Sequence, residues 1–287
     1  MGVHGGPVFR QGISVRLGRC GGDALNRTTI RFVAVALAGS LAVAAGCTQQ
    51  PLSPEGERLF RAGHQDYEAA RYAQADQSFT QVIDRNQQSW ALSEVYYFRG
   101  LTRLCLNRRD DAKSDFARGA SRKGRHIAQV YCAVALANIE HEDGNDARAV
   151  HLYEQILRQS SLDDVPVDAV LYRLGVSQQR LGRWNDADET FARLIHKHPD
   201  STLRDAAQRR FQAAFFTVQV GAFVDRRSAD AAAAKLTQAK WPVRITVAAE
   251  KGKTLHKVSV GRYQTYAQAA AAAATLRQQG HSVMIVP

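Results

Sequence analysis

The sequence predicts a chain of two parts, an α-helical repeat array followed by a small α+β domain with the ferredoxin-like order βαββαβ. Three observations predict this fold. Four helix–helix turns recur in the middle of the chain at nearly constant spacing, which indicates an array of helical hairpins. A strand-like segment at 217–223 returns forty residues later at 257–263, with apolar and polar residues alternating in each copy. Each copy is followed by an alanine-rich helical segment and a further apolar run.

Residues 1–46 are predicted to be a signal peptide, with a start site that the sequence leaves open. Arg27 and Arg31 precede an apolar run at 32–45, which is too short to span a bilayer and has the length of a signal-peptide core. The run ends in Ala-Ala-Gly-Cys47, which resembles the lipobox of bacterial lipoproteins, although Ala44 stands where that family usually has Leu. The resemblance implies cleavage before Cys47 and lipidation of Cys47. The alternative is an ordinary cleavage site followed by an unmodified Cys.

Residues 47–56 are predicted to be the lipidated Cys47 and a short extended tether. The lipid would be the membrane attachment, since no other apolar run approaches the roughly 20 residues of a transmembrane helix. Thr48 resembles the outer-membrane sorting pattern of Gram-negative lipoproteins, in which Asp after the Cys commonly retains the protein in the inner membrane. We therefore expect the protein at the periplasmic face of the outer membrane.

The formal net charge of +11 is unevenly distributed. Residues 1–47 carry five Arg and one Asp, whereas residues 48–213 carry 23 basic and 23 acidic residues. Residues 214–287 carry ten basic residues and three acidic residues, a surplus of +7. The surplus of the mature chain thus lies in the C-terminal domain, where it indicates either an anionic partner or only a solubilising surface.

Residues 57–213 are predicted to form four divergent repeats and a closing helix. In each turn an Ala follows the small residue or Asn by five positions, and an aromatic residue lies four positions further on. The alanines are Ala75, Ala112, Ala149 and Ala187, spaced by 37, 37 and 38 residues, and the aromatics are Phe79, Phe116, Tyr153 and Phe191. A small Ala lets paired helices approach, and the aromatic ring fills the gap beside it. The closing helix is expected at 201–215, with Ala206, Ala207, Phe211 and Ala214 on its packed side.

These residues resemble tetratricopeptide repeats, most clearly in the fourth unit with Gly175, Gly182, Trp184, Ala187 and Phe191. The units depart from the family pattern because the Tyr of the first helix is missing. Its places are taken by Asp66, Arg103, Glu140 and Gln178. The resemblance implies a concave groove for a protein or peptide. Arg99, Arg103 and Arg173 are candidates for lining it, and an ordinary solvated helix face is the alternative.

No catalytic site, metal site or cofactor is predicted. The segment 141–146 has metal-ligand residue types, but it lies at a repeat turn and is expected to be a polar turn. His196 and His198 are expected at a helix C-terminus, where the helix dipole favours them. Cys105 and Cys132 are about ten positions apart in repeat register, or roughly 15 Å along a helix, so we expect two buried, unpaired thiols.

Residues 214–287 resemble a SPOR domain, both in the two Gly-x-aromatic strands and in the alanine-rich helix after each. SPOR domains are bacterial modules that bind septal peptidoglycan, so the resemblance implies binding to glycan strands stripped of their stem peptides. Strict alternation places Thr217, Gln219 and Phe223 on the face of the first strand away from the helices. By the internal repeat, Lys257, Ser259 and Tyr263 occupy the matching face of the third strand, which neighbours the first in a ferredoxin-like sheet.

These six side chains suit N-acetyl sugars, and removal of the stem peptide exposes a lactyl carboxylate that the positive charge would complement. The leading hypothesis is therefore an envelope protein that binds peptidoglycan glycan strands and recruits division or wall-remodelling proteins. A second hypothesis is an outer-membrane assembly scaffold in which the repeats are the main functional part. A third, an RNA-recognition module, is disfavoured because the third strand lacks the expected aromatic motif, so no nucleic-acid partner is expected.

Overall fold

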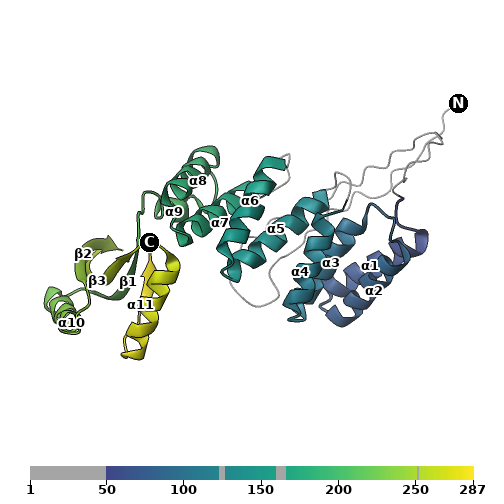
Figure 1. The fold of residues 1–287 in the computed structure, drawn as a ribbon. Helices are drawn as coiled ribbons and strands as arrows, with labels where there is room; N and C mark the ends of the chain where they lie inside the picture. The colour runs from purple at the N-terminus through teal and green to yellow at the C-terminus, as the bar shows by residue number, and fades with distance from the viewer. Residues whose placement is uncertain (1–49, 123–126, 160–165, 251) are drawn as a thin grey trace. The chain divides into compact units, whose positions relative to one another are not determined.

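The computed structural model describes residues 50–122, 127–159, 166–250 and 252–287 (Figure 1). The chain divides into two compact units. The first contains the helices as far as Ile139, and the second contains Glu140–Leu157 and Val167–Pro287. Cys47 and the signal peptide lie outside the described residues. Among the helices that are described, none is long and apolar enough to cross a membrane.

The predicted helical hairpins are present. Their helices are α1 (Pro54–Glu68), α2 (Tyr72–Arg85), α3 (Leu92–Cys105), α4 (Arg109–Ala120), α5 (Ile127–Glu142), α6 (Asp146–Gln159), α7 (Val167–Arg180), α8 (Trp184–Lys197) and α9 (Arg204–Gln208). The four repeat alanines and the four repeat aromatics are fully buried. A Cβ atom at Gly100 would lie 2.5 Å from the Phe116 ring, and one at Gly175 would lie 2.6 Å from the Phe191 ring. The small residue of one helix therefore makes room for the aromatic residue of the next, which confirms the predicted packing.

Two of the three arginines proposed to line a groove, Arg99 and Arg103, instead form ion pairs inside the first unit. Arg173 is half-buried in α7, and its place in a groove stays a prediction. Arg99 is 5% exposed and donates to both carboxylate oxygens of Asp115, at 3.0 and 2.7 Å. Arg103 donates to Asp115 at 2.8 Å and to Asp76 at 2.9 Å. Arg99 therefore neither lines a groove nor lies on a solvated face, and both predictions for it are wrong. Arg103 occupies the position that is Tyr in tetratricopeptide repeats, and here it is part of the ionic network around Asp115.

The predicted tether is too long at its C-terminal end. Helix α1 begins at Pro54, where Ser53 caps it by accepting a hydrogen bond from the Gly56 N–H at 3.0 Å. The Ser53 N–H donates to Asn86 at 2.8 Å, and Gln50 forms a β-bridge with Ser89. Gln50 and Ser53 are therefore held by hydrogen bonds to the end of α2 and the loop after it.

The closing helix is shorter than predicted. Helix α9 covers only Arg204–Gln208, and Ala207 is its fully buried residue. The chain then leaves the helical path at Gln212, whose φ of +62° is left-handed. The Gln212 N–H donates to the side chain of Asp188 at 2.8 Å, a bond that holds this turn.

The two cysteines differ in burial. Cys132 in α5 is a free thiol that is fully buried, and this burial raises its pKa. Cys105 at the end of α3 is half-buried and disulfide-bonded, so the prediction of a buried, unpaired thiol is wrong at this position. Because Cys132 is free, the two do not pair with each other, as predicted.

The C-terminal part has the predicted βαββαβ order. Its elements are β1 (Phe216–Phe223), α10 (Arg226–Gln238), β2 (Val243–Glu250), β3 (Lys253–Tyr263), α11 (Tyr266–Gln278) and β4 (Met284–Val286). The strands form one antiparallel sheet in the order β2-β3-β1-β4, so the first and third strands are neighbours, as predicted.

Both helices pack on one face of this sheet (Figure 1). The buried strand residues are Phe216, Val218, Val258 and Val260, and they share a core cluster with Ala229 and Leu236 of α10 and with Ala269, Ala272, Ala273 and Leu276 of α11. The many alanines let the helices lie close to the sheet. Each helix has a side-chain cap, from Asp225 in α10 and from Thr265 in α11.

Candidate binding face of the C-terminal sheet

The sheet face away from the helices carries a row of side chains across all four strands. Gln219 on β1 is paired with Ser259 on β3, Ser259 with Arg244 on β2, and Gln219 with Met284 on β4. The chain neighbours of each of these four residues pack into the core cluster. Since side chains alternate along a strand, the four point to the opposite face, which we call the open face.

Two further sets of paired residues extend the open face on either side of this row. Lys257 on β3 is paired with Thr246 on β2 and with Ala222 on β1. Thr217 near the start of β1 is paired with Val286 on β4. Thr217, Gln219, Lys257 and Ser259 therefore lie where the sequence predicted, on the open face of two adjacent strands.

Phe223 and Tyr263 do not belong to the open face. Both rings pack against the core on the helix side, and burial raises the pKa of the Tyr263 phenol. The prediction of their position was wrong because each strand contains an irregularity that shifts the alternation. In β1 it lies between Gln219 and Gly221, and in β3 it lies beside Gly261, whose φ is +70°. The same shift moves Ala222, expected on the helix side, onto the open face opposite Lys257.

The Gly-x-aromatic motif itself has a structural role. A Cβ atom at Gly221 would lie 2.6 Å from the Phe223 ring, and one at Gly261 would lie 2.4 Å from the Tyr263 ring. These distances are too short for a side chain, so each Gly provides space for the aromatic ring two residues later. The space beside each Gly is therefore filled by an aromatic ring of the protein itself.

The charged groups of this face are basic. Arg244 is exposed, and no carboxylate in the described part of the chain lies within ion-pair distance of it. Arg262, also exposed, lies over the ring of Phe215, 4.5 Å from its centroid. Lys257 is half-buried within the sheet face. An anionic ligand could therefore pair with Arg244 without first displacing an acidic side chain of the described chain.

The open face combines hydrogen-bonding side chains with one large apolar one. Gln219 supplies an amide, Thr217 supplies a hydroxyl, and Met284, which is 56% exposed, supplies an apolar contact. Ser259 stands in the same row but is only 9% exposed. Sequence reasoning missed Arg244, Thr246 and Met284. The alternation at 243–247 was a signal for the first two, but only the strand pairing shows which residues stand beside Gln219.

The other candidate segments of the sequence lie in the helical repeats, where they have structural roles. The segment 141–146 forms the turn between α5 and α6, where His141 Nδ1 lies 2.7 Å from the Ser177 hydroxyl. His196 lies in the last turn of α8, and His198 is its C-cap residue, as predicted. Among the described residues there is no group of three His, Cys, Asp or Glu side chains that could hold a metal ion.

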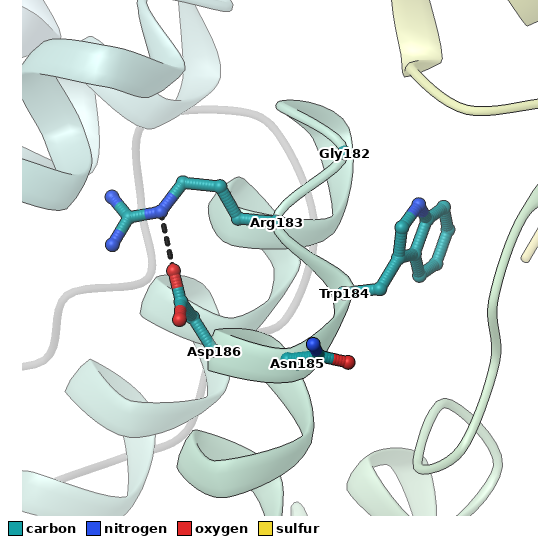
Figure 2. A pocket seen from close by; sticks show the side chains of 5 residues that line it. All are labelled: Gly182, Arg183, Trp184, Asn185 and Asp186. Atoms are coloured by element: carbon teal, nitrogen blue, oxygen red, sulfur yellow. Dashed lines mark hydrogen bonds and ion pairs between the residues drawn. The ribbon is translucent and has the colours of Figure 1, made fainter.

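A pocket lies at the turn between α7 and α8, lined by Gly182, Arg183, Trp184, Asn185 and Asp186. Figure 2 shows the Arg183 side chain directed to Asp186, to which it donates a hydrogen bond of 2.6 Å. The Trp184 indole points away from this pair. The turn thus has an ion pair on one side and the buried Trp184 ring on the other.

Comparison with protein families identifies the two parts. Residues 212–287 match the SPOR domain, and residues 169–201 match a tetratricopeptide repeat. The chain therefore combines a SPOR domain, a domain class that binds peptidoglycan, with tetratricopeptide repeats, a repeat class that binds proteins.

Comparison with solved structures gives similar helical chains at low identity. MamA of AMB-1 is 19% identical over 54% of this chain and 78% of its own, with a TM-score of 0.43. A tetratricopeptide repeat protein from Parabacteroides merdae is 13% identical over 55% of this chain and 59% of its own, with a TM-score of 0.49. A search of curated proteins gave no match.

Proposed function

We propose that this protein is a lipid-anchored envelope protein that binds peptide-stripped glycan strands of septal peptidoglycan and recruits protein partners through its repeats. Residues 1–46 would be the signal peptide, and Cys47 would carry the lipid that holds the protein at the periplasmic face of the outer membrane. The proposed role is in cell division or wall remodelling. The observation that carries it is the row Arg244–Ser259–Gln219–Met284 on the open face of the SPOR sheet.

The chemistry of this row fits a glycan strand better than a small ligand. An open sheet face can accommodate an extended polymer, and amide and hydroxyl side chains can bond the N-acetyl and hydroxyl groups of successive sugars. Met284 can contact the apolar face of a sugar ring. Arg244 and Lys257 can pair with the lactyl carboxylate that is exposed once the stem peptide has been removed.

The binding hypothesis is tested with the full chain and purified sacculi. We expect the protein to sediment with sacculi that an amidase has stripped of stem peptides, and much less with untreated sacculi. Gln219→Ala should weaken this binding about tenfold, because it removes an amide that bonds the ligand. Gln238→Ala is the matched control, since Gln238 is an exposed amide on α10, on the covered side of the same sheet. Equal binding to both kinds of sacculi, or equal effects of the two variants, would contradict the proposal.

Localisation and anchoring are tested in cells. A fluorescent fusion of the full chain should concentrate at division septa, and Gln219→Ala should disperse it around the periphery. A wild-type fusion that is uniformly peripheral would instead support the assembly-scaffold hypothesis. Cys47→Ala should abolish metabolic labelling with a fatty acid, and undiminished labelling would exclude Cys47 as the lipid attachment site.

A further inference from the structure

The fourth repeat contacts the SPOR domain through Trp184, the first residue of α8. Trp184 is only 8% exposed, and it belongs to the same core cluster as Phe216, Val218 and the two SPOR helices. Its ring lies 4.9 Å from that of Phe216, centroid to centroid, and its indole N–H donates to the carbonyl oxygen of Gln264 at 3.0 Å. A residue of the repeats thus completes the core of the neighbouring domain.

Two residues beside Trp184 complete this contact. Gly182 lies so close to the SPOR domain that a Cβ atom there would be 2.9 Å from the carbonyl oxygen of Gln264. The guanidinium of Arg180 lies 5.3 Å from the centroid of the Tyr266 ring, a cation–π contact. Tyr266 in turn packs edge-on against Phe216, 5.8 Å away. The contact therefore combines a buried aromatic, a close backbone approach and a cation over a ring.

The segment that joins α9 to β1 is bound to the fourth repeat along its length. Gln179, which is fully buried, donates to the carbonyl oxygen of Arg210 at 2.9 Å and accepts from the Arg210 guanidinium at 2.9 Å. The Gln212 N–H donates to Asp188, and Ala213 packs against the SPOR core. This segment differs from a flexible linker, in which the backbone would be bonded to water.

The equivalent turn of the third repeat shows that these contacts are specific to the fourth. Gly144 occupies the place of Gly182 and has nearly the same φ, +77° against +79°. A Cβ atom at Gly144 would meet nothing within 4 Å. The place of Trp184 is taken by Tyr72, Arg109 and Asp146 in the other three units. A large aromatic that joins the SPOR core is therefore a feature of the last repeat.

From these contacts we propose that the fourth repeat and the SPOR domain act as one rigid unit, in which Trp184 is a positioning residue for the glycan-binding face. Phe216, the partner of Trp184, directly precedes Thr217 on the open face, and Gln264 directly follows the end of β3. Trp184 thus holds the ends of the two central strands that carry Gln219 and Ser259. The smallest complete binding unit is then residues 167–287, and the last repeat keeps a constant orientation toward a bound glycan strand.

The docking is tested in the full chain by limited proteolysis with trypsin, which cleaves after Arg209 and Arg210. We expect the native chain to resist cleavage there, and Trp184→Ala to be cleaved at these two sites at least tenfold faster. Tyr72→Ala is the matched control at the same position of the first repeat, where its ring packs on Tyr67 within its own hairpin. Trp184→Phe, which keeps the ring but loses the hydrogen bond, should restore most of the resistance. Equal cleavage of Trp184→Ala and the native chain would overturn the proposal.

A second pair of variants separates docking from stability of the repeats. Gly182→Ala and Gly144→Ala carry the same left-handed strain, but only Gly182→Ala also collides with Gln264. We expect faster cleavage after Arg209 and Arg210 in Gly182→Ala alone. Equal cleavage of the two variants would show that the turn, and not the docking, controls access.

The effect on the open face rests on the proposed glycan binding and is measured separately. Trp184→Ala should weaken binding to stripped sacculi severalfold and leave the far-ultraviolet circular dichroism of the repeats unchanged. Unaltered binding by a Trp184→Ala chain that is cleaved quickly would refute the positioning role. If the native chain itself does not bind sacculi, the proposed function fails, whereas the proteolysis still decides whether the two parts are docked.

Discussion

The repeats and the SPOR domain use arginine in opposite ways. Arg99 in the repeats is 5% exposed, and its guanidinium donates two hydrogen bonds to Asp115 and one to Thr80. Arg244 on the SPOR sheet is exposed, with no carboxylate of the described chain in ion-pair range. The net charges follow the same division, zero over residues 48–213 and +7 over residues 214–287. Arg99 therefore stabilises the fold of the repeats, whereas Arg244 on the open face is available to a ligand.

The largest expected effect comes from breaking the ionic network in the repeats. Asp115→Ala leaves the buried Arg99 without its partner and should lower the free energy of unfolding by about 3–5 kcal/mol. Urea denaturation of the full chain measures this loss. Asp111→Ala is the control, because Asp111 pairs with Arg108 at a side-chain exposure of 52%, so its removal should lower the free energy of unfolding far less. Similar losses in the two variants would contradict the distinction between buried and exposed pairs.

A smaller effect is expected from His141 in the repeats. Its titration should make the free energy of unfolding depend on pH. Burial, together with the positive charges of Arg180, Arg173 and Arg210, lowers the pKa of His141 to about 4. Below its ordinary pKa of 6.5 the unfolded chain binds a proton that the folded chain does not, so stability falls as the pH falls from 6.5 toward 4. The contribution is about 2 kcal/mol between about pH 7 and pH 5.

The measurement is urea denaturation at both pH values, with the native chain and with His141→Asn. Asp146, 3.8 Å from His141, has a pKa that burial raises, and an effect of this carboxyl should appear equally in both chains. The variant should therefore lose about 2 kcal/mol less on acidification. Equal losses in the two chains would show that His141 is protonated in the folded state.

The smallest expected effect is on the open face. Arg244→Ala should weaken binding to stripped sacculi about fivefold, or about 1 kcal/mol, because an exposed ion pair is worth little. It should change the free energy of unfolding by less than about 0.5 kcal/mol. Added salt should reduce the difference between the variant and the native chain. Arg226→Ala makes an equal change of charge on α10 of the same domain and is the control for long-range attraction. An equal loss of sacculus binding in Arg226→Ala would show that Arg244 does not contact the ligand directly.

Much of the fold could be predicted because it depends on local patterns. The repeat alanines and aromatics recur at a nearly constant spacing, and each is fully buried. The alternation of β1 also placed Gln219 correctly, since Val218 on one side of it has no exposed surface. The network around Asp115 could not be predicted in this way, because it joins residues of three helices whose pairing the sequence pattern does not specify.

The sequence by itself determined the order of the elements, the division into repeats and SPOR domain, and the polar character of the open face. These properties follow from periodicity and composition, which are local. Only the tertiary structure decided that Phe223 and Tyr263 belong to the core, because an irregularity in each strand reverses the alternation after it. It also decided that Arg244 and Met284 stand beside Gln219, and that Trp184 packs into the SPOR core, since strand pairing and domain packing join residues far apart in the chain.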